Sequence, residues 1–179
     1  AVLSIETLKM LPTDYSAHML TELKTGSFGL FNPFVKYTQR YSDSFVASVA
    51  SEYTHADNNF PFTLKNISLI THEKRVHNKM DSYHGEVDLR WSINKLSNLS
   101  TKIYYYDNNR QLPGQVIYYT NISGQSLRDR NAFLQTYFTT RNTSGNLSLK
   151  VHAKVNWAAS IYKDDVYPGG IKDASYWQR

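Results

Sequence analysis

The sequence contains no cysteine, no long apolar run and none of the familiar catalytic motifs. Without cysteine the chain can form no disulfide framework and no thiolate zinc site, and it has no cysteine nucleophile. Because no run of about 18 apolar residues is present, no transmembrane helix is expected. The chain also lacks a Gly-x-Ser-x-Gly elbow, a phosphate-binding loop and a His-Glu-x-x-His pair, so we do not expect an enzyme.

Charge and composition narrow the class of protein further. The formal net charge is +5, but the 20 basic residues are scattered among 15 acidic ones, which argues against nucleic-acid binding. Only 41% of the residues are hydrophobic, and 14 of the 179 are tyrosine. Such a composition is compatible with a membrane barrel, in which every second residue faces the lumen or water, and also with other β-proteins.

The most regular pattern lies in residues 83–94. One phase holds Tyr83, Gly85, Val87, Leu89, Trp91 and Ile93, and the other holds His84, Glu86, Asp88, Arg90, Ser92 and Asn94. Since successive side chains of a strand point to opposite faces, this stretch predicts a strand with one apolar and one charged face. Its length suits a bilayer-spanning strand of about 9–11 residues better than the common soluble strand of about 5–6.

Residues 146–158 repeat this alternation, with Leu147, Leu149, Val151, Ala153, Val155 and Trp157 in one phase. A soluble sandwich with its apolar faces packed inside fits such strands, and so does a membrane barrel. Two long repeats that each end in tryptophan favour the barrel, with Trp91 and Trp157 as anchors near opposite membrane borders. The residues then expected to line the lumen are Glu52, Glu86, Asp88, Arg90, Lys150, His152 and Lys154.

The same alternation predicts further strands along the chain. Strands are expected at residues 1–10, 14–24, 31–40, 45–54, 83–94, 99–106, 132–141 and 146–158. Pro33 interrupts one of them, and we expect a bulge there because proline lacks a ladder donor. The pattern also predicts a polar loop at 55–82, a small hairpin at 116–119 and a loop at 160–179.

The predicted connections between these strands alternate in length: short, long, short, long, short, long. The one exception is the Gly26-Ser27 turn, which is short where a long connection is due. Outer-membrane barrels have short turns on the periplasmic side and longer loops outside the cell. The alternation therefore favours the barrel.

Several segments resemble the TonB-dependent outer-membrane receptors. Residues 1–7 (Ala-Val-Leu-Ser-Ile-Glu-Thr) look like the last strand of that family's plug domain. Residues 40–45 (Arg-Tyr-Ser-Asp-Ser-Phe) and 52–62 (Glu-Tyr-Thr-His-Ala-Asp-Asn-Asn-Phe-Pro-Phe) are similar to its Ser-Asp-x-Phe and Tyr-x-x-Ser-Asp-Gly-x-Tyr-Pro-Phe motifs. Residues 104–114 end in Arg-Gln-Leu-Pro-Gly and are similar to a Tyr-x-Arg-Gly-Leu-Pro-Gly loop of members from Bacteroidota.

The resemblance extends over nearly the whole chain, with two departures: Asn59 and Gln111 stand where the family usually has glycine. It implies an all-β fold, an antiparallel transmembrane β-barrel segment of about seven strands from a 22-stranded plugged barrel. Residues 1–12 would be the last plug strand and its linker, and residues 13–179 the N-terminal part of the barrel with its extracellular loops. Because this is about a third of such a barrel, we expect the sequence to be a fragment.

The resemblance also implies a function. Members of the family lie in the bacterial outer membrane and import a scarce nutrient, such as a ferric siderophore or cobalamin, when TonB pulls the plug open. The expected partners are outer-membrane lipid, the nutrient ligand, a surface lipoprotein, and TonB through a segment absent from this chain; no cofactor is implied. The alternative is a soluble secreted β-sandwich that binds glycan or protein.

Candidate ligand contacts are expected in the long loops. If the plug ends in the periplasm, the connections after Thr54, Tyr106 and Ala158 all lie outside the cell, and Arg75, His77, Tyr106 and Arg110 are the residues we expect to contact the ligand. A metal site is not expected, because His72, His77, His84, Glu73 and Glu86 lack the helical spacing of such sites. Asp164 and Asp165 are interpreted as turn residues rather than paired catalytic acids.

Overall fold

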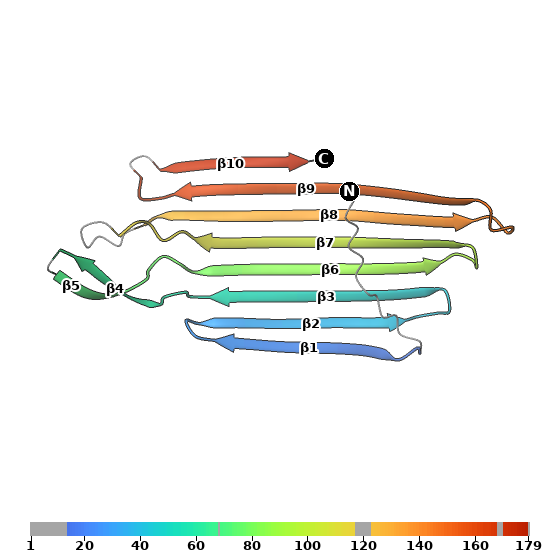
Figure 1. Cartoon of the computed structure of the whole chain (residues 1–179), viewed down its shortest axis with the longest axis horizontal. Helices are drawn as coiled ribbons and strands as arrows, with labels where there is room; N and C mark the ends of the chain where they lie inside the picture. The colour runs from blue at the N-terminus through green and yellow to red at the C-terminus, as the bar shows by residue number, and fades with distance from the viewer. Residues whose placement is uncertain (1–13, 68, 117–122, 168–169, 179) are drawn as a thin grey trace.

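The computed structural model describes residues 14–67, 69–116, 123–167 and 170–178, and these form one large antiparallel sheet and one hairpin (Figure 1). The large sheet has eight strands in the order β1-β2-β3-β6-β7-β8-β9-β10. Its strands are β1 (Ala17–Gly26), β2 (Leu30–Arg40), β3 (Phe45–Ala56), β6 (Met80–Ser92), β7 (Ser97–Gln111), β8 (Gln125–Arg141), β9 (Ser148–Asp164) and β10 (Ile171–Gln178). The hairpin consists of β4 (Pro61–Asn66) and β5 (Leu69–Lys74).

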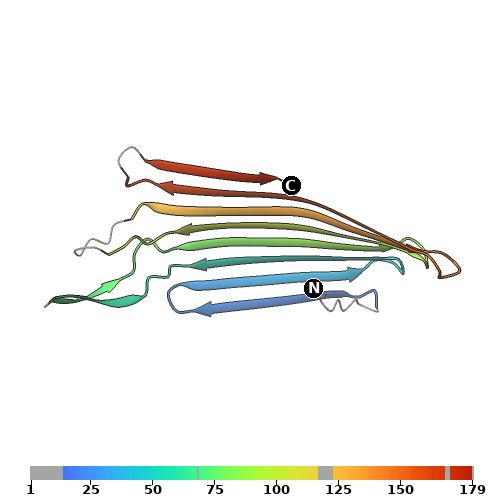
Figure 2. The same ribbon diagram turned by 45° about the horizontal axis from the view of Figure 1, so that its top comes forward.

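The large sheet is a single open layer. Figure 2, turned by 45°, shows the eight strands side by side in one twisted sheet, with the β4–β5 hairpin projecting past one end. β1 and β10 are its two edges, so the sheet does not close into a barrel. Within the described residues, no helix has the length and apolar character needed to span a membrane.

Almost nothing is buried in this layer. Among the described residues the only buried hydrophobic side chains are the alanines Ala50, Ala56 and Ala159. Val151 and Val155 are 47% and 61% exposed, so they do not meet other strands across a packed interior. The described residues therefore form no sandwich core, and the sheet is held together by its backbone ladder and by side chains that touch within each face.

Most predicted strands are present, and several are longer than expected. Strands were expected at 31–40, 45–54 and 83–94, and the structure has β2, β3 and β6 there. β7 and β9 extend well past residues 106 and 158, because strand pairing continues through polar residues that carry no apolar alternation. The strand expected at 1–10, the plug boundary at 12 and residues 117–119 of the hairpin expected at 116–119 lie outside the described residues.

Two loop predictions were wrong. The polar segment 55–82 contains the β4–β5 hairpin, and the tail 160–179 contains β10, which pairs with the end of β9. Both segments were interpreted as loops because they lack a long apolar phase. A backbone ladder needs only free N–H and C=O groups on a neighbouring strand, so a polar segment can pair with the open edge of the strand before it.

The bulge expected at Pro33 was also wrong. Pairing between β2 and β3 joins Phe31 to His55 and Phe34 to Glu52, so no residue is inserted between them. In this register Pro33 lies opposite Tyr53. Because proline has no N–H, Pro33 cannot donate to the Tyr53 carbonyl. The Asn32 amide lies 2.9 Å from the Tyr53 carbonyl oxygen and donates in place of the proline. The strand therefore stays regular because a side chain supplies the missing donor.

The two long connections between strands of the large sheet, which follow β3 and β7, leave the same end of the sheet. The connections that follow β3, β7 and β9 lie at the left end in Figure 1, together with the β1–β2 turn, and we call this the loop end. The three short connections 41–44, 93–96 and 142–147 lie at the other end, the turn end. The alternation of connection lengths predicted from the sequence is therefore present as far as β9, including the short turn at Ser27. The long connection expected after β9 was wrong, because the connection 165–170 has six residues, as many as the short connection 142–147.

Candidate functional site

The two sides of the large sheet have opposite chemistry. One side, the apolar face, carries a continuous row across five strands, formed by Val49, Val87, Ile103, Leu134 and Val155. Most of these side chains are about half exposed. A row of aliphatic side chains left open over five strands is a surface that has to be covered in the working protein.

Along the strands, aromatic residues border this aliphatic row on both sides, toward the turn end and toward the loop end. At the turn end, cross-strand pairing places Phe45, Trp91 and Phe138 in one row through Leu99. At the loop end, Tyr53 pairs with Tyr83 at 4.8 Å between ring centroids, and Tyr105 and Trp157 pair with Ala132 between them. Trp91 and Trp157 thus lie at opposite ends of the apolar face.

The two aromatic rows are separated by a distance close to the height of a bilayer's apolar core. On β3, Phe45 and Tyr53 are eight residues apart. At about 3.4 Å per residue this is about 27 Å along the strand, and strand tilt shortens it toward an apolar band of about 25 Å or less.

The other side of the sheet, the polar face, contains a hollow of about 260 Å³ near the loop end. It is lined by Glu52, Thr54, Ser82, His84, Tyr104 and Tyr106. Glu52, His84 and Tyr106 are direct cross-strand partners on β3, β6 and β7, so the ladder itself brings them together. The hollow therefore follows from strand register rather than from loop conformation.

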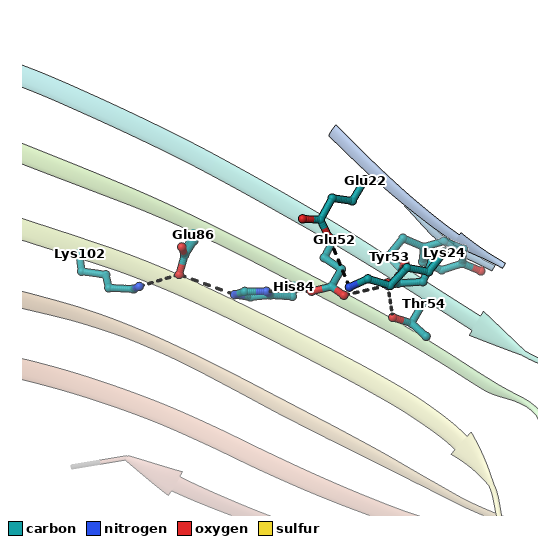
Figure 3. Close-up of polar contacts among 9 residues, drawn as sticks. Glu22, Lys24, Glu52, Tyr53, Thr54, His84, Glu86 and Lys102 are labelled. Carbon is teal, nitrogen blue, oxygen red and sulfur yellow. Dashed lines mark hydrogen bonds and ion pairs between the residues drawn. The ribbon is translucent and has the colours of Figure 1, made fainter. Parts of the chain in front are cut away.

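The polar groups around the hollow form a connected network (Figure 3). His84 lies between two carboxylates, with its Nδ1 3.7 Å from Glu52 and its Nε2 3.8 Å from Glu86. Glu86 is neutralised by the Lys102 ammonium at 2.6 Å. Glu52 accepts a hydrogen bond from the Asn32 amide at 2.8 Å. Among the described side chains Glu52 has no cation other than a protonated His84 within ion-pair distance, so the hollow favours a cationic or hydroxyl-rich ligand group.

The hollow also has unused hydrogen-bonding capacity. Within the described residues, His84 Nε2, in the lining of the hollow, and Asn108 Oδ1, outside that lining, are buried and have no hydrogen-bond partner. Leaving such groups unpaired costs about 1–3 kcal/mol each, so a bound molecule that satisfied them would be stabilised. A ligand in the hollow would therefore gain most from a donor or acceptor placed at His84 Nε2.

The structure separates the four residues expected to contact a ligand. Tyr106 lines the hollow. Arg75 donates to the carbonyls of Pro113 and Gly114 at 3.0 and 2.9 Å, so it links one long connection to the next. His77 bonds the carbonyl of Gln125 at 2.7 Å and links its connection to the start of β8. Arg110 forms an ion pair with Asp129 at 3.3 Å.

The sequence predicts that Glu52 and Glu86 lie on the lumen side. It does not single out the other site residues Asn32, Thr54, Ser82 and Tyr104. The available signal was their shared phase, opposite the apolar residues on each strand. The alternation along one strand does not give the register between strands, and that register is what brings these residues together. No group of three or more His, Asp or Glu residues in the described part of the chain is placed to hold a metal ion.

Charged residues gather on the apolar face at the loop-end aromatic border and just beyond it. Asp81 accepts hydrogen bonds from the Tyr53 hydroxyl at 2.6 Å and from His55 at 2.8 Å, and these bonds lower the pKa of the Asp81 carboxyl. Asp107 accepts two hydrogen bonds from Arg128, which lower the pKa of the Asp107 carboxyl. The apolar face therefore ends abruptly in ionised groups on its loop side.

A comparison with models of known protein families found no match, and a comparison with curated protein sequences found none either.

Proposed function

We propose that this chain is part of a TonB-dependent outer-membrane receptor: the end of the plug and the N-terminal strands of the barrel. One observation carries the proposal. The apolar face is open over five strands and is bordered at both ends by aromatic residues, while the opposite side of the same strands is charged. Lipid is the covering that suits a band of this height with aromatic borders.

Three further features support the proposal. Consecutive strands of the large sheet are antiparallel neighbours, except where the β4–β5 hairpin intervenes, as in an up-and-down barrel wall. The long connections share one end, as extracellular loops do. Both edges, β1 and β10, are open to further strands of a larger barrel. A soluble β-sandwich would need a second sheet over the apolar face, and the described residues contain only the projecting β4–β5 hairpin.

In this function the polar face lines the lumen, and the hollow at Glu52, His84 and Tyr106 lies on the path between the extracellular loops and the periplasm. The nutrient, a ferric siderophore, cobalamin or a similar scarce compound, binds at the loops and the lumen wall. TonB, energised from the inner membrane, then opens the plug. Arg75 holds two neighbouring loops together and His77 holds its loop to the start of β8, so both shape the entrance through the loop conformation.

The orientation of the sheet in a membrane can be tested at two adjacent positions of β9. Because this chain has no cysteine, Val155→Cys and Asn156→Cys each place a single labelling site in it. A fluorophore at position 155 should be quenched by brominated acyl chains when the natural full-length protein is in lipid nanodiscs, and one at position 156 should not. Equal quenching at the two positions would contradict the proposed orientation.

The transport function is tested in cells that carry the natural gene. Uptake of radioiron supplied as a ferric siderophore, or of radiolabelled cobalamin, should fall when the gene is deleted and when a protonophore collapses the inner-membrane gradient. Uptake of the compound that depends on the gene but resists the protonophore would contradict a TonB-driven mechanism.

A further inference from the structure

Two arginines of β8 share the carboxylate of Asp107 on the apolar face. Asp107 lies two residues past Tyr105 on β7 and pairs with Tyr83, so the cluster is at the loop-end aromatic border. The Arg128 guanidinium donates to both oxygens of Asp107, from Nε at 2.9 Å and from Nη2 at 2.6 Å. Tyr105 donates to the same carboxylate at 3.1 Å. The Asp107 side chain is only 10% exposed, so its hydrogen-bonding capacity is largely taken up by these two neighbours.

The second arginine, Arg130, is left underused. Its Nε lies 3.8 Å from Asp107 Oδ2, too far for a hydrogen bond, and this buried Nε has no hydrogen-bond partner within the described residues. The side chain is still 31% exposed. A guanidinium carries five N–H donors, and two guanidiniums against one carboxylate leave a net positive charge. The cluster of Asp107, Arg128 and Arg130 therefore has one excess positive charge, which one more anion would balance.

The place of this cluster identifies the anion. Arg130 pairs across the ladder with Ala159, two residues past Trp157, and with Asp107, which in turn pairs with Tyr83. Aromatic belts lie at the level of the lipid headgroups, so charged groups just outside the belt meet the headgroup phosphates. Arginine forks match the geometry of phosphate oxygens and form charge-assisted hydrogen bonds with them.

We propose that Arg128 and Arg130 bind the phosphate of a lipid headgroup and so fix the depth of this wall in the membrane. The inference rests on the proposed function, because it needs the apolar face to lie in a bilayer. It goes beyond that function by assigning a lipid site to two particular residues on the outer side of the sheet.

A matched control lies on the polar face at the same level. Arg110 of β7 pairs with Asp129 of β8 at 3.3 Å, and Ser160 donates to the other oxygen of Asp129. That cluster has one cation and one carboxylate, so it has no net charge, and it points away from the lipid side. Arg110→Gln therefore removes an arginine of the same region without touching the proposed lipid site.

The test uses the natural full-length protein in nanodiscs of phosphatidylcholine with a minor fraction of phosphatidic acid. Native mass spectrometry after extraction gives the enrichment of phosphatidic acid among the retained lipids. Each arginine near a charged lipid surface contributes about fivefold in binding, from about 1 kcal/mol per basic residue. Arg130→Gln should therefore lower the enrichment about fivefold and Arg128→Gln/Arg130→Gln further, whereas Arg110→Gln should match the unchanged protein.

Asp107→Asn gives the opposite result, because it removes the carboxylate that competes with the phosphate, and enrichment should rise. A purely structural role for the cluster predicts no such rise. Unchanged enrichment in the double variant, an equal loss in Arg110→Gln, or retention of inorganic phosphate as strong as that of phosphatidic acid would overturn the lipid site.

The fluorophore at Val155→Cys separates this inference from the function on which it rests. If brominated lipid quenches it but phosphatidic acid is not enriched, only the lipid site is overturned. If brominated lipid does not quench this fluorophore, both the proposed membrane orientation and the proposed lipid site are contradicted.

Discussion

At the scale of single residues, Asn32 shows how one side chain keeps a strand regular. It is buried, 6% exposed, and its amide nitrogen lies within 2.9 Å of Glu52 Oε1, the Tyr53 carbonyl oxygen and Thr54 Oγ1. Asn32 therefore donates both to the backbone carbonyl opposite Pro33 and to the Glu52 carboxylate of the hollow.

Replacing Asn32 with alanine should lower the free energy of unfolding by about 1–3 kcal/mol, because a buried carbonyl and a carboxylate lose their donor. Denaturant titration of the full-length protein measures the loss. Asn146→Ala, in the exposed turn between β8 and β9, is the control and should change the free energy of unfolding by less than about 0.5 kcal/mol. Equal effects of the two substitutions would show that the Asn32 contacts do not support the strand.

Asp107 makes stability depend on pH at the same scale. Arg128 holds the pKa of this carboxyl below its ordinary value, so the pair stabilises the folded state above the unfolded-state pKa of about 3.9 and loses that effect as the pH falls through the folded-state pKa. Between pH 7 and pH 5, Asp107→Asn should be less stable than the unchanged protein by about 1–3 kcal/mol. The gap should close below about pH 4, as measured by denaturant titration across pH. A constant gap would contradict the pairing.

At the scale of single elements, the β4–β5 hairpin is the clearest departure from the sequence-based expectation. Its residues are polar and mixed, which is why residues 55–82 were predicted to be a loop. The hairpin forms between Asn66 and Leu69, and at its tip Ile67 has a positive φ of 50° and is 95% exposed. A β-branched residue is strained in that conformation, and no burial compensates for it.

Ile67→Asn should therefore stabilise the hairpin, because asparagine tolerates a positive φ and the isoleucine side chain buries nothing. A gain of about 1 kcal/mol corresponds to about fivefold slower hydrogen exchange at the amides of β4 and β5. Ile70→Asn is the control, since Ile70 is also exposed but lies within β5, where its φ is not positive. Equal slowing by the two substitutions would contradict an origin in backbone strain.

At the scale of the whole molecule, the main feature is one open layer with an uncovered apolar face. The alternation in residues 83–94 and 146–158 was enough to predict which residues share a face. It did not show whether that face packs against another sheet, because soluble sandwiches and membrane walls use the same two-residue period. The described residues form one layer, and the aromatic borders of its apolar face are visible only once the strands are aligned.

A charge in the middle of the apolar face tests this arrangement. Val155→Arg should destabilise the full-length protein in lipid vesicles by about 2–4 kcal/mol, the cost of a basic side chain at mid-bilayer on the lipid side of a barrel. Asn156→Arg, the next residue on the polar face, should cost much less. Comparable losses in denaturant titration would argue against lipid contact on the Val155 side.

The sequence by itself determined the all-β class, most of the strands, the alternation of short and long connections as far as β9, and the division into an apolar and a polar side. These follow from local rules, since side-chain direction alternates residue by residue along every strand. Three features became apparent only in the tertiary structure. They are the hollow at Glu52, His84 and Tyr106, the aromatic borders of the apolar face, and the position of two arginines beside Asp107. Each of these joins residues from different strands, and the register between strands depends on non-local hydrogen bonds that no single stretch of sequence encodes.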